Sequence, residues 1–303
     1  MENRFRGWYG PDAPRPMILA HRGDSSRAPE NTIESARLGH SAGADGWELD
    51  VRLTRDGVPV VLHDESLLRT TDVARRFEGD PRAEAGYLIG GFTLEEVRTL
   101  DAGSWFLDPS GGPRSAAGFG TFERLGDADR AHYASGAVRI PTLAEALALT
   151  VQLDWMVNVE IKPTSGDVVF AVSAVLEAVR EAGAVGVVAV SSFDPKAVAL
   201  AASVGSGLAT GLLVAEPPDR PAVQLLGELK ADALHAPADV FSWPVGLRPS
   251  PARASAGRRD VPILVYTVND PGPGGLADRL AGSGASGVFT DDPASLALRW
   301  IGR

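Results

Sequence analysis

The stretch that decides the fold is residues 46–64, Gly-Trp-Glu-Leu-Asp-Val-Arg-Leu-Thr-Arg-Asp-Gly-Val-Pro-Val-Val-Leu-His-Asp. Acidic and apolar residues alternate in its first half, so in a strand Glu48 and Asp50 share one face and the apolar residues take the other. An Asp-Gly pair then separates two extended runs, which is a hairpin signal. We therefore expect residues 58–62 to fold back antiparallel over the second strand, and residues near 50 to lie opposite those near 63.

Outward from this stretch, short apolar runs alternate with helical segments. Such alternation is typical of βα units around a parallel sheet. Eight runs predict an α/β fold of the closed (β/α)8 TIM type, with an insertion after strand two. The expected strands are 16–20, 46–51, 155–161, 186–190, 211–214, 233–236, 261–267 and 287–290. The expected helices are 32–41, 142–150, 168–182, 195–203, 221–229, 275–282 and 293–301.

Residues 65–139 interrupt this alternation. They contain one expected short helix, 93–100, and a stretch rich in Gly, Pro, Ser and Ala, 108–120. A piece this long in a compact domain is usually functional or mobile. We expect a subdomain or lid over the barrel mouth, without a separate hydrophobic core. Residues 1–303 as a whole are expected to form a single domain, because TIM-type barrels typically hold about 250 residues in one domain.

Capping residues mark several helix starts. Thr142 is followed three residues later by a Glu, which makes a capping box, and Asn31 resembles the start of another. Asp194 and Asp292 each precede a proline at the first helical position. We therefore assign these two acids to capping and give them no catalytic role.

The composition is that of a globular protein, with 44% hydrophobic and 22% charged residues. The absence of cysteine excludes disulfides, thiolate zinc sites and cysteine nucleophiles. A net charge of -10 disfavours binding to nucleic acid or to an anionic membrane. No apolar run approaches the roughly 18 residues of a transmembrane helix. The polar, proline-rich N-terminus lacks the apolar centre of a signal peptide, so a cytoplasmic location is expected.

Three acidic side chains lie on predicted strands near the face where such barrels carry their active sites. A charge within a strand is costly unless it is paired or bound to metal. A salt bridge, such as Glu160 with Arg22, would satisfy one of them. Glu48, Asp50 and Glu160 together instead predict a metal site. Oxygen ligands without cysteine suit one hard divalent cation, Mg²⁺ or Ca²⁺.

Basic groups are expected at the same face. His21 and His63 fall there, and a pair of histidines is an arrangement that general acid–base catalysis uses. No role is expected for His40 or His132, and His235 is placed in a strand that faces the lumen without an assigned role. Lys162 fits a point-charge contact to phosphate, although an ion pair with Glu160 would also explain it.

Short motifs along the chain resemble the glycerophosphodiester phosphodiesterase family in order and spacing. They are His21-Arg22-Gly23, 29–32, 48–51, 54–57, His63-Asp64, Arg69-Thr70-Thr71, 100–106, 139–143, 160–162, 192–194, 267–269 and 287–291. Each is weak alone, but together they run in register from about residue 17 to 294. Two features differ from the family pattern: Tyr266 stands where Trp is common, and residues 107–136 form a longer stretch.

The resemblance implies a TIM-type barrel that hydrolyses glycerophosphodiesters, which are small molecules, to glycerol phosphate and an alcohol. It matches His21 and His63 to the family's acid–base pair, and Arg22 and Lys162 to its phosphate contacts. The metal ligands that it implies are Glu48, Asp50 and Glu160. A cyclic phosphate intermediate is expected, because the neighbouring glycerol hydroxyl attacks with the advantage of proximity. The side chains expected at the pocket wall are Trp105, Phe106 and Tyr266.

Three other readings remain open from the residues. A lysophospholipase D or sphingomyelinase D-like enzyme on a related barrel would need an apolar groove, which Phe92, Trp105, Phe106, Phe119 and Phe122 would supply. A metal-free glycosidase would use Glu48 and Glu160 as its two carboxylates, but it leaves both histidines and Lys162 without a role. A barrel that has lost catalysis and only binds phosphorylated ligands would lack one of the groups that the reaction requires, and no such group is missing from the sequence.

Overall fold

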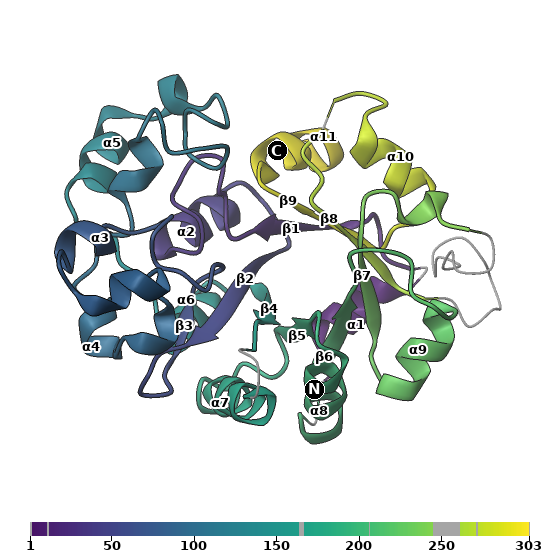
Figure 1. Ribbon diagram of the computed structural model, residues 1–303. Helices are drawn as coiled ribbons and strands as arrows, with labels where there is room; N and C mark the ends of the chain where they lie inside the picture. The colour runs from purple at the N-terminus through teal and green to yellow at the C-terminus, as the bar shows by residue number, and fades with distance from the viewer. Residues whose placement is uncertain are drawn as a thin grey trace.

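The computed structural model describes residues 2–10, 12–163, 167–205, 207–244, 261–270 and 272–302. Within them, nine strands form one sheet in the order β1-β9-β8-β7-β6-β5-β4-β2-β3, and β1 also pairs with β2. That last pairing closes a ring of parallel strands, with helices around its outside (Figure 1). The expected (β/α)8 barrel is confirmed.

Each expected apolar run overlaps a barrel strand. The strands are β1 (Met17–His21), β2 (Gly46–Leu53), β4 (Met156–Ile161), β5 (Val188–Ser192), β6 (Ala209–Leu213), β7 (Ala233–Pro237), β8 (Ile263–Tyr266) and β9 (Gly287–Thr290). The helices that connect them also fall where they are expected. They are α2 (Ile33–Ser41), α6 (Leu143–Gln152), α7 (Val168–Glu181), α8 (Pro195–Val204), α9 (Ala222–Leu229), α10 (Leu276–Gly282) and α11 (Pro293–Ile301).

The hairpin expected after strand two is also present. Strand β3 (Pro59–Val61) runs antiparallel to the end of β2, with Val51 opposite Val61. The next amide, that of Leu62, donates to the carbonyl of Asp50 at 2.9 Å. The fold-back therefore carries His63 to the edge of the barrel where the β2 carboxylates lie.

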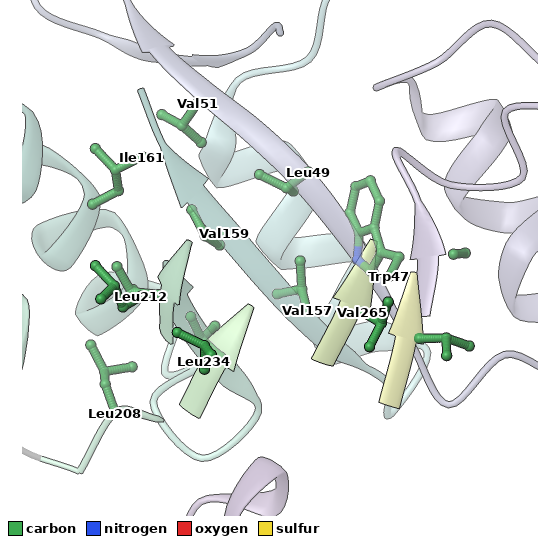
Figure 2. Packing of buried hydrophobic residues seen from close by; sticks show 14 of the residues in the cluster. Trp47, Leu49, Val51, Val157, Val159, Ile161, Leu208, Leu212, Leu234 and Val265 are labelled. Atoms are coloured by element: carbon green, nitrogen blue, oxygen red, sulfur yellow. The ribbon is translucent and has the colours of Figure 1, made fainter. Parts of the chain in front are cut away.

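The outward faces of the strands form the main hydrophobic core against the helices. Figure 2 shows the alternate residues of β2 and β4 pointing to this layer, Trp47 and Val157 among them. Trp47 is fully buried, stacks parallel to Trp155 with ring centroids 6.1 Å apart, and donates from Nε1 to Thr150 Oγ1. Because side chains alternate along a strand, this packing turns the residues between them toward the lumen.

A short N-terminal helix that the sequence analysis did not predict packs with the residues that fill the other end of the lumen. Helix α1 (Arg4–Tyr9) is capped by Asn3, whose side chain accepts from the amide of Phe5. Phe5 is fully buried in a cluster with lumen residues such as Met17 and Leu264. Six residues with one apolar pair four apart are too short a pattern to distinguish from a polar, proline-rich terminus.

Residues 65–139 lie between β3 and α6 and carry three short helices, α3 (Val73–Arg76), α4 (Leu94–Val97) and α5 (Asp127–Ala134). Figure 1 draws them, blue to teal, beside β2 and α2. They enclose a hydrophobic cluster that includes Phe92, Phe106 and Tyr133. This cluster is separate from the main core, which the sequence analysis did not expect, but it is shared with the barrel side, because it also includes Ala28, Val60, Leu62 and Ile140. The segment's apolar residues are spread over short helices and turns, so they show no period in the sequence.

The capping predictions hold except for one. Thr142, Asp194 and Asp292 each accept a backbone N–H at a helix start. Helix α2 is instead capped by Thr32, and Asn31 precedes that cap with a positive φ of 60°. The assignment of Asn31 to capping is therefore wrong.

None of the described helices is long and apolar enough to cross a membrane.

Candidate active site

Three carboxylates meet at the barrel mouth. Glu48 and Asp50 project from β2, and Glu160 projects from β4, where the strand register places it directly beside Asp50. Each is buried, and one oxygen from each lies within 4.8 Å of the others. The structure thus brings together the three acids that the sequence analysis selected.

The pKa values of these acids diverge because their surroundings differ. Burial, with the neighbouring charges of Asp50 and Glu160, raises the pKa of Glu48 well above its ordinary value. Burial and the Asp50 carboxylate likewise raise the pKa of Glu160. Burial opposes ionisation of Asp50 as well, but the charges of Arg22 and Lys162 outweigh it and lower the pKa of that carboxyl. The cluster therefore has three carboxylates but only two neighbouring cations, Arg22 and Lys162.

The donor set fits a hard cation. Glu48 Oε1 is buried and has no hydrogen-bond partner among the described residues. A buried oxygen of this kind carries a large desolvation penalty unless a donor or an ion meets it. Carboxylate oxygens are the ligands that Mg²⁺ and Ca²⁺ prefer. The residues present therefore fit a divalent metal ion.

His21 ends β1 and is anchored by an acid to which the sequence analysis gave no role. Its Nδ1 lies 2.7 Å from Asp291 Oδ1, at the end of β9, and its Nε2 lies 3.9 Å from Glu48 Oε2. An ionised carboxylate only accepts, so Nδ1 carries the hydrogen and Nε2 is left free toward the carboxylate cluster. Burial, opposed by the Asp291 charge, lowers the pKa of His21.

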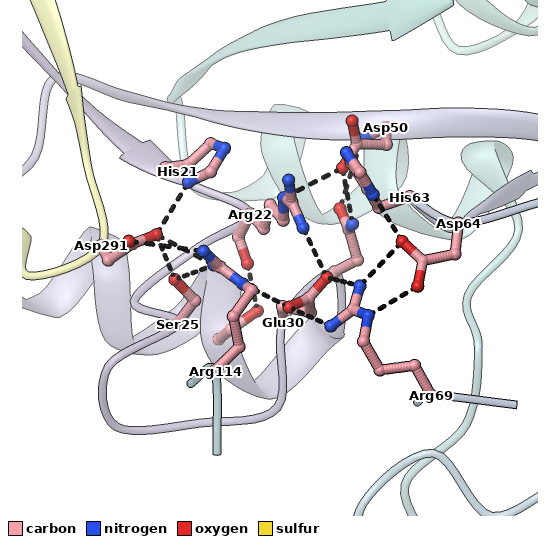
Figure 3. A network of polar contacts seen from close by, with 12 residues as sticks. His21, Arg22, Ser25, Glu30, Asp50, His63, Asp64, Arg69, Arg114 and Asp291 are labelled. Atoms are coloured by element: carbon pink, nitrogen blue, oxygen red, sulfur yellow. Dashed lines mark hydrogen bonds and ion pairs between the residues drawn. The ribbon is translucent and has the colours of Figure 1, made fainter. Parts of the chain in front are cut away.

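His63 is held in the same way from the other side of the mouth. Its Nδ1 lies 2.6 Å from Asp64 Oδ1, and its carbonyl accepts from Arg52 Nε at 2.8 Å. Both histidines thus have Nδ1 tied to an aspartate, the arrangement that orients an imidazole for proton transfer at Nε2. Figure 3 shows both pairs.

Two cations lie among the acids. Lys162 Nζ lies 2.5 Å from Glu160 Oε1 and 3.1 Å from Asp50 Oδ1. The ion pair that the sequence analysis kept as an alternative therefore exists. Arg22 donates to Glu30 from NH1 at 2.7 Å, and its Nε lies 3.2 Å from Asp50 Oδ2, without hydrogen-bond geometry.

Asn31 belongs to this site. Its amide donates to Asp50 Oδ2 at 2.9 Å and accepts from the Asp50 amide at 3.2 Å. Its left-handed backbone turns the side chain from the helix start toward the carboxylate, so the resemblance to a capping box was misleading. The contact is non-local, and only the fold brings the two residues together.

A cavity of about 260 Å³ joins these groups. Its lining includes both histidines and the two cations, and one side is apolar, formed by Phe193, Leu213, Tyr266 and Phe289. Tyr266 is thus placed at the wall where it is expected. Phe106 is fully buried in the 65–139 cluster and Trp105 packs against that cluster, so the wall assignment is wrong for Phe106, and Trp105 is not among the lining residues. A larger hollow between α7 and α8 is mainly apolar and lies outside the barrel.

Residues 21–295 match the model of the glycerophosphoryl diester phosphodiesterase family. A glycerophosphodiester phosphodiesterase of Caldanaerobacter subterraneus is 40% identical over 139 residues, which are 45% of this chain and 52% of that protein. The alignment thus spans about half of that relative. YqiK, an uncharacterized protein of Bacillus subtilis, is 30% identical over 91% of this chain and 95% of its own length.

A solved structure shares the fold over nearly the whole chain. It is a phosphodiesterase of Oleispira antarctica in complex with the product sn-glycerol-3-phosphate, 29% identical, with a TM-score of 0.71. The match covers 95% of this chain and 98% of that one.

Proposed function

Because the chain belongs to the glycerophosphoryl diester phosphodiesterase family, we propose that it hydrolyses glycerophosphodiesters to glycerol phosphate and an alcohol. The observation that carries this proposal is the site itself. Two histidines, each with Nδ1 on an aspartate, line one cavity with a buried carboxylate cluster and two cations. This set supplies acid–base groups and anion binding in one place, as hydrolysis of an anionic diester requires.

The carboxylates would hold one divalent ion, Mg²⁺ or Ca²⁺, with Glu48, Asp50 and Glu160 as its ligands. Bound there, the ion would neutralise charge on the phosphate oxygens. Arg22 and Lys162 line the same cavity and would contact the non-bridging oxygens. Both are held in place by acids, so the positive charge is oriented before the substrate arrives.

The proton transfers fall to His21 and His63. One takes the proton from the glycerol hydroxyl next to the phosphate as that oxygen attacks phosphorus, and the other protonates the leaving alcohol. The cyclic phosphate is then opened by water with the two roles exchanged. The Nδ1 anchors leave Nε2 of each ring to carry these protons. The assignment of base and acid between the two rings stays open.

Residues 1–303 would form a single domain around this chemistry, with residues 65–139 as an insertion subdomain or lid over the mouth. The lysophospholipase D or sphingomyelinase D reading has less support. Of the aromatic residues that it needs, Phe92 and Phe106 are fully buried, and the others pack against the same cluster. Two of these five side chains are thus unavailable to an apolar groove, and the other three are partly buried against the same core.

The test is release of alcohol from glycerophosphocholine and related diesters, with lysophosphatidylcholine as the comparison substrate. We expect turnover of the glycerol diesters, loss of activity with EDTA and recovery with Mg²⁺ or Ca²⁺. His21→Ala and His63→Ala should each lose about 10²–10⁴-fold in kcat, the usual effect of removing a general acid or base. Full activity in metal-free protein, or a wild-type rate in either variant, would contradict the proposed roles.

A further inference from the structure

An arginine from the 65–139 segment reaches into the site and touches groups from both ends of the chain. Arg114 donates from Nε to Glu30 Oε2 at 2.6 Å. Its NH2 donates to Asp291 Oδ1 at 2.9 Å and to Ser25 Oγ at 3.0 Å. Its side chain is 22% exposed, so it lies at the edge of the buried network. None of the motifs that resemble the family includes this residue.

Glu30 is the hub of that network. Its side chain is 2% exposed and meets three guanidinium groups. Arg22 and Arg69 donate to Oε1, and Arg69 and Arg114 donate to Oε2. Because of these three cations, the pKa of Glu30 lies well below its ordinary value despite burial. A single carboxylate thus fixes three arginines relative to one another.

Two of those arginines lead to the two histidines by equivalent routes. Arg69 donates to Asp64, which holds Nδ1 of His63. Arg114 donates to Asp291, which holds Nδ1 of His21. Figure 3 shows both routes converging on Glu30. The orientation of each imidazole is therefore tied to the same buried acid.

We propose that Arg114 is a positioning residue for His21, through which the 65–139 segment sets the geometry of the reaction. The inference rests on the proposed function, because it assigns His21 a proton to move. Among the described residues, Arg114 is the only lysine or arginine within ion-pair distance of Asp291. It compensates the charge of that buried carboxylate, so that Asp291 stays ionised and keeps its hydrogen bond to His21.

An arginine is needed for the bridge. Its planar fork donates to Glu30 and Asp291 together, whereas a lysine is a point charge on a flexible stem and reaches one carboxylate well. The surrounding backbone is also fixed to the barrel loops. Thr121 Oγ1 donates to the carbonyl of Ser26 in the loop after β1, and within the segment the Arg114 guanidinium lies 5.5 Å from the Phe119 ring centre. The position of the segment is thereby transmitted to Asp291.

The experiment compares Arg114→Met and Arg114→Lys with Arg124→Met. Arg124 is exposed in the same segment, and its side chain makes no hydrogen bond or ion pair within the described residues, so it is the matched control. We expect Arg114→Met to lose about 10- to 100-fold in kcat, the range found for outer partners that orient the ligands of a metal, with KM changed less than about threefold. Arg114→Lys should lie between it and wild type.

A kcat for Arg114→Met equal to that of Arg124→Met would overturn the inference. So would a rise in KM with kcat unchanged, which would make Arg114 a substrate contact. Should the methionine variant fail to fold, the lysine variant decides, and a wild-type kcat there overturns the inference. A second readout is independent of turnover: the downfield Nδ1 proton resonance of His21 should move in Arg114→Lys and stay unchanged in Arg124→Met. If the wild-type protein is inactive on every diester, the proposed function is wrong. The Nδ1 resonance still tests whether Arg114 positions His21.

Discussion

Replacing Asp291 by asparagine tests how much of the catalysis depends on a residue that the sequence analysis placed in a motif but gave no role. The side chain is 5% exposed, and it accepts hydrogen bonds from His21, Ser25, Arg114 and Asn269. All four partners are donors. An amide in place of the carboxylate must therefore direct its own N–H groups at a donor, whichever way it is turned.

The two possible orientations of that amide set a lower and an upper limit for the loss in kcat. With its oxygen toward His21, the hydrogen bond survives without charge, and the difference between charged and neutral hydrogen bonds, about 1–1.5 kcal/mol, is roughly tenfold in rate. With its nitrogen toward His21, Nδ1 must become the acceptor and Nε2 carries the proton. The imidazole then has the wrong tautomer, and the loss extends to about 10⁴-fold. We expect kcat of Asp291→Asn to fall between these limits.

The matched control is Asp64→Asn, because Asp64 makes the same contact with His63. There the two side chains are 29% and 34% exposed, and water screens their interaction. We expect that variant to lose less than about tenfold. The assay is steady-state release of choline from glycerophosphocholine at saturating metal, with thermal unfolding of each variant as the check on folding. A wild-type kcat for Asp291→Asn, or equal losses in the two variants, would refute the argument from burial.

Two further predictions concern stability. A Cβ at Gly211 would lie 2.4 Å from Nε2 of the fully buried His235, so Gly211→Ala should lower the free energy of unfolding by about 1–3 kcal/mol. Adding His235→Ala to the same chain should recover part of that loss, as measured by denaturant titration. Additive effects of the two substitutions would contradict the clash. The pKa of Asp291 is lowered despite burial, by His21 and Arg114, so its contribution to stability is complete above the unfolded value of about 3.9 and is lost as the pH falls below it. Urea unfolding between about pH 5 and 2 should show a shallower pH dependence in Asp291→Asn than in wild type, and identical slopes would show that Asp291 is not coupled to folding.

Much of the fold and of the carboxylate cluster could be predicted from the sequence, because both depend on local alternation of side chains along a strand. A strand that buries Trp47 and its apolar neighbours against helices must turn Glu48 and Asp50 to the other face, and this holds whatever surrounds it. The hairpin that carries His63 back to Asp50 follows from an Asp-Gly turn only a few residues away. The closed barrel follows from the number of repeated units.

The supporting network was decided by the tertiary structure alone. Asp291 touches His21 across 270 positions of the chain, and Arg114 touches Asp291 across 177. No local pattern marks Arg114, and the local pattern at Asn31 pointed to helix capping. Such contacts arise where a closed barrel brings its first and last strands together, as β1 and β9 pair here. Residue spacing along a strand determines which face a side chain lies on. Contacts between residues of distant elements form only when the strands close into the barrel.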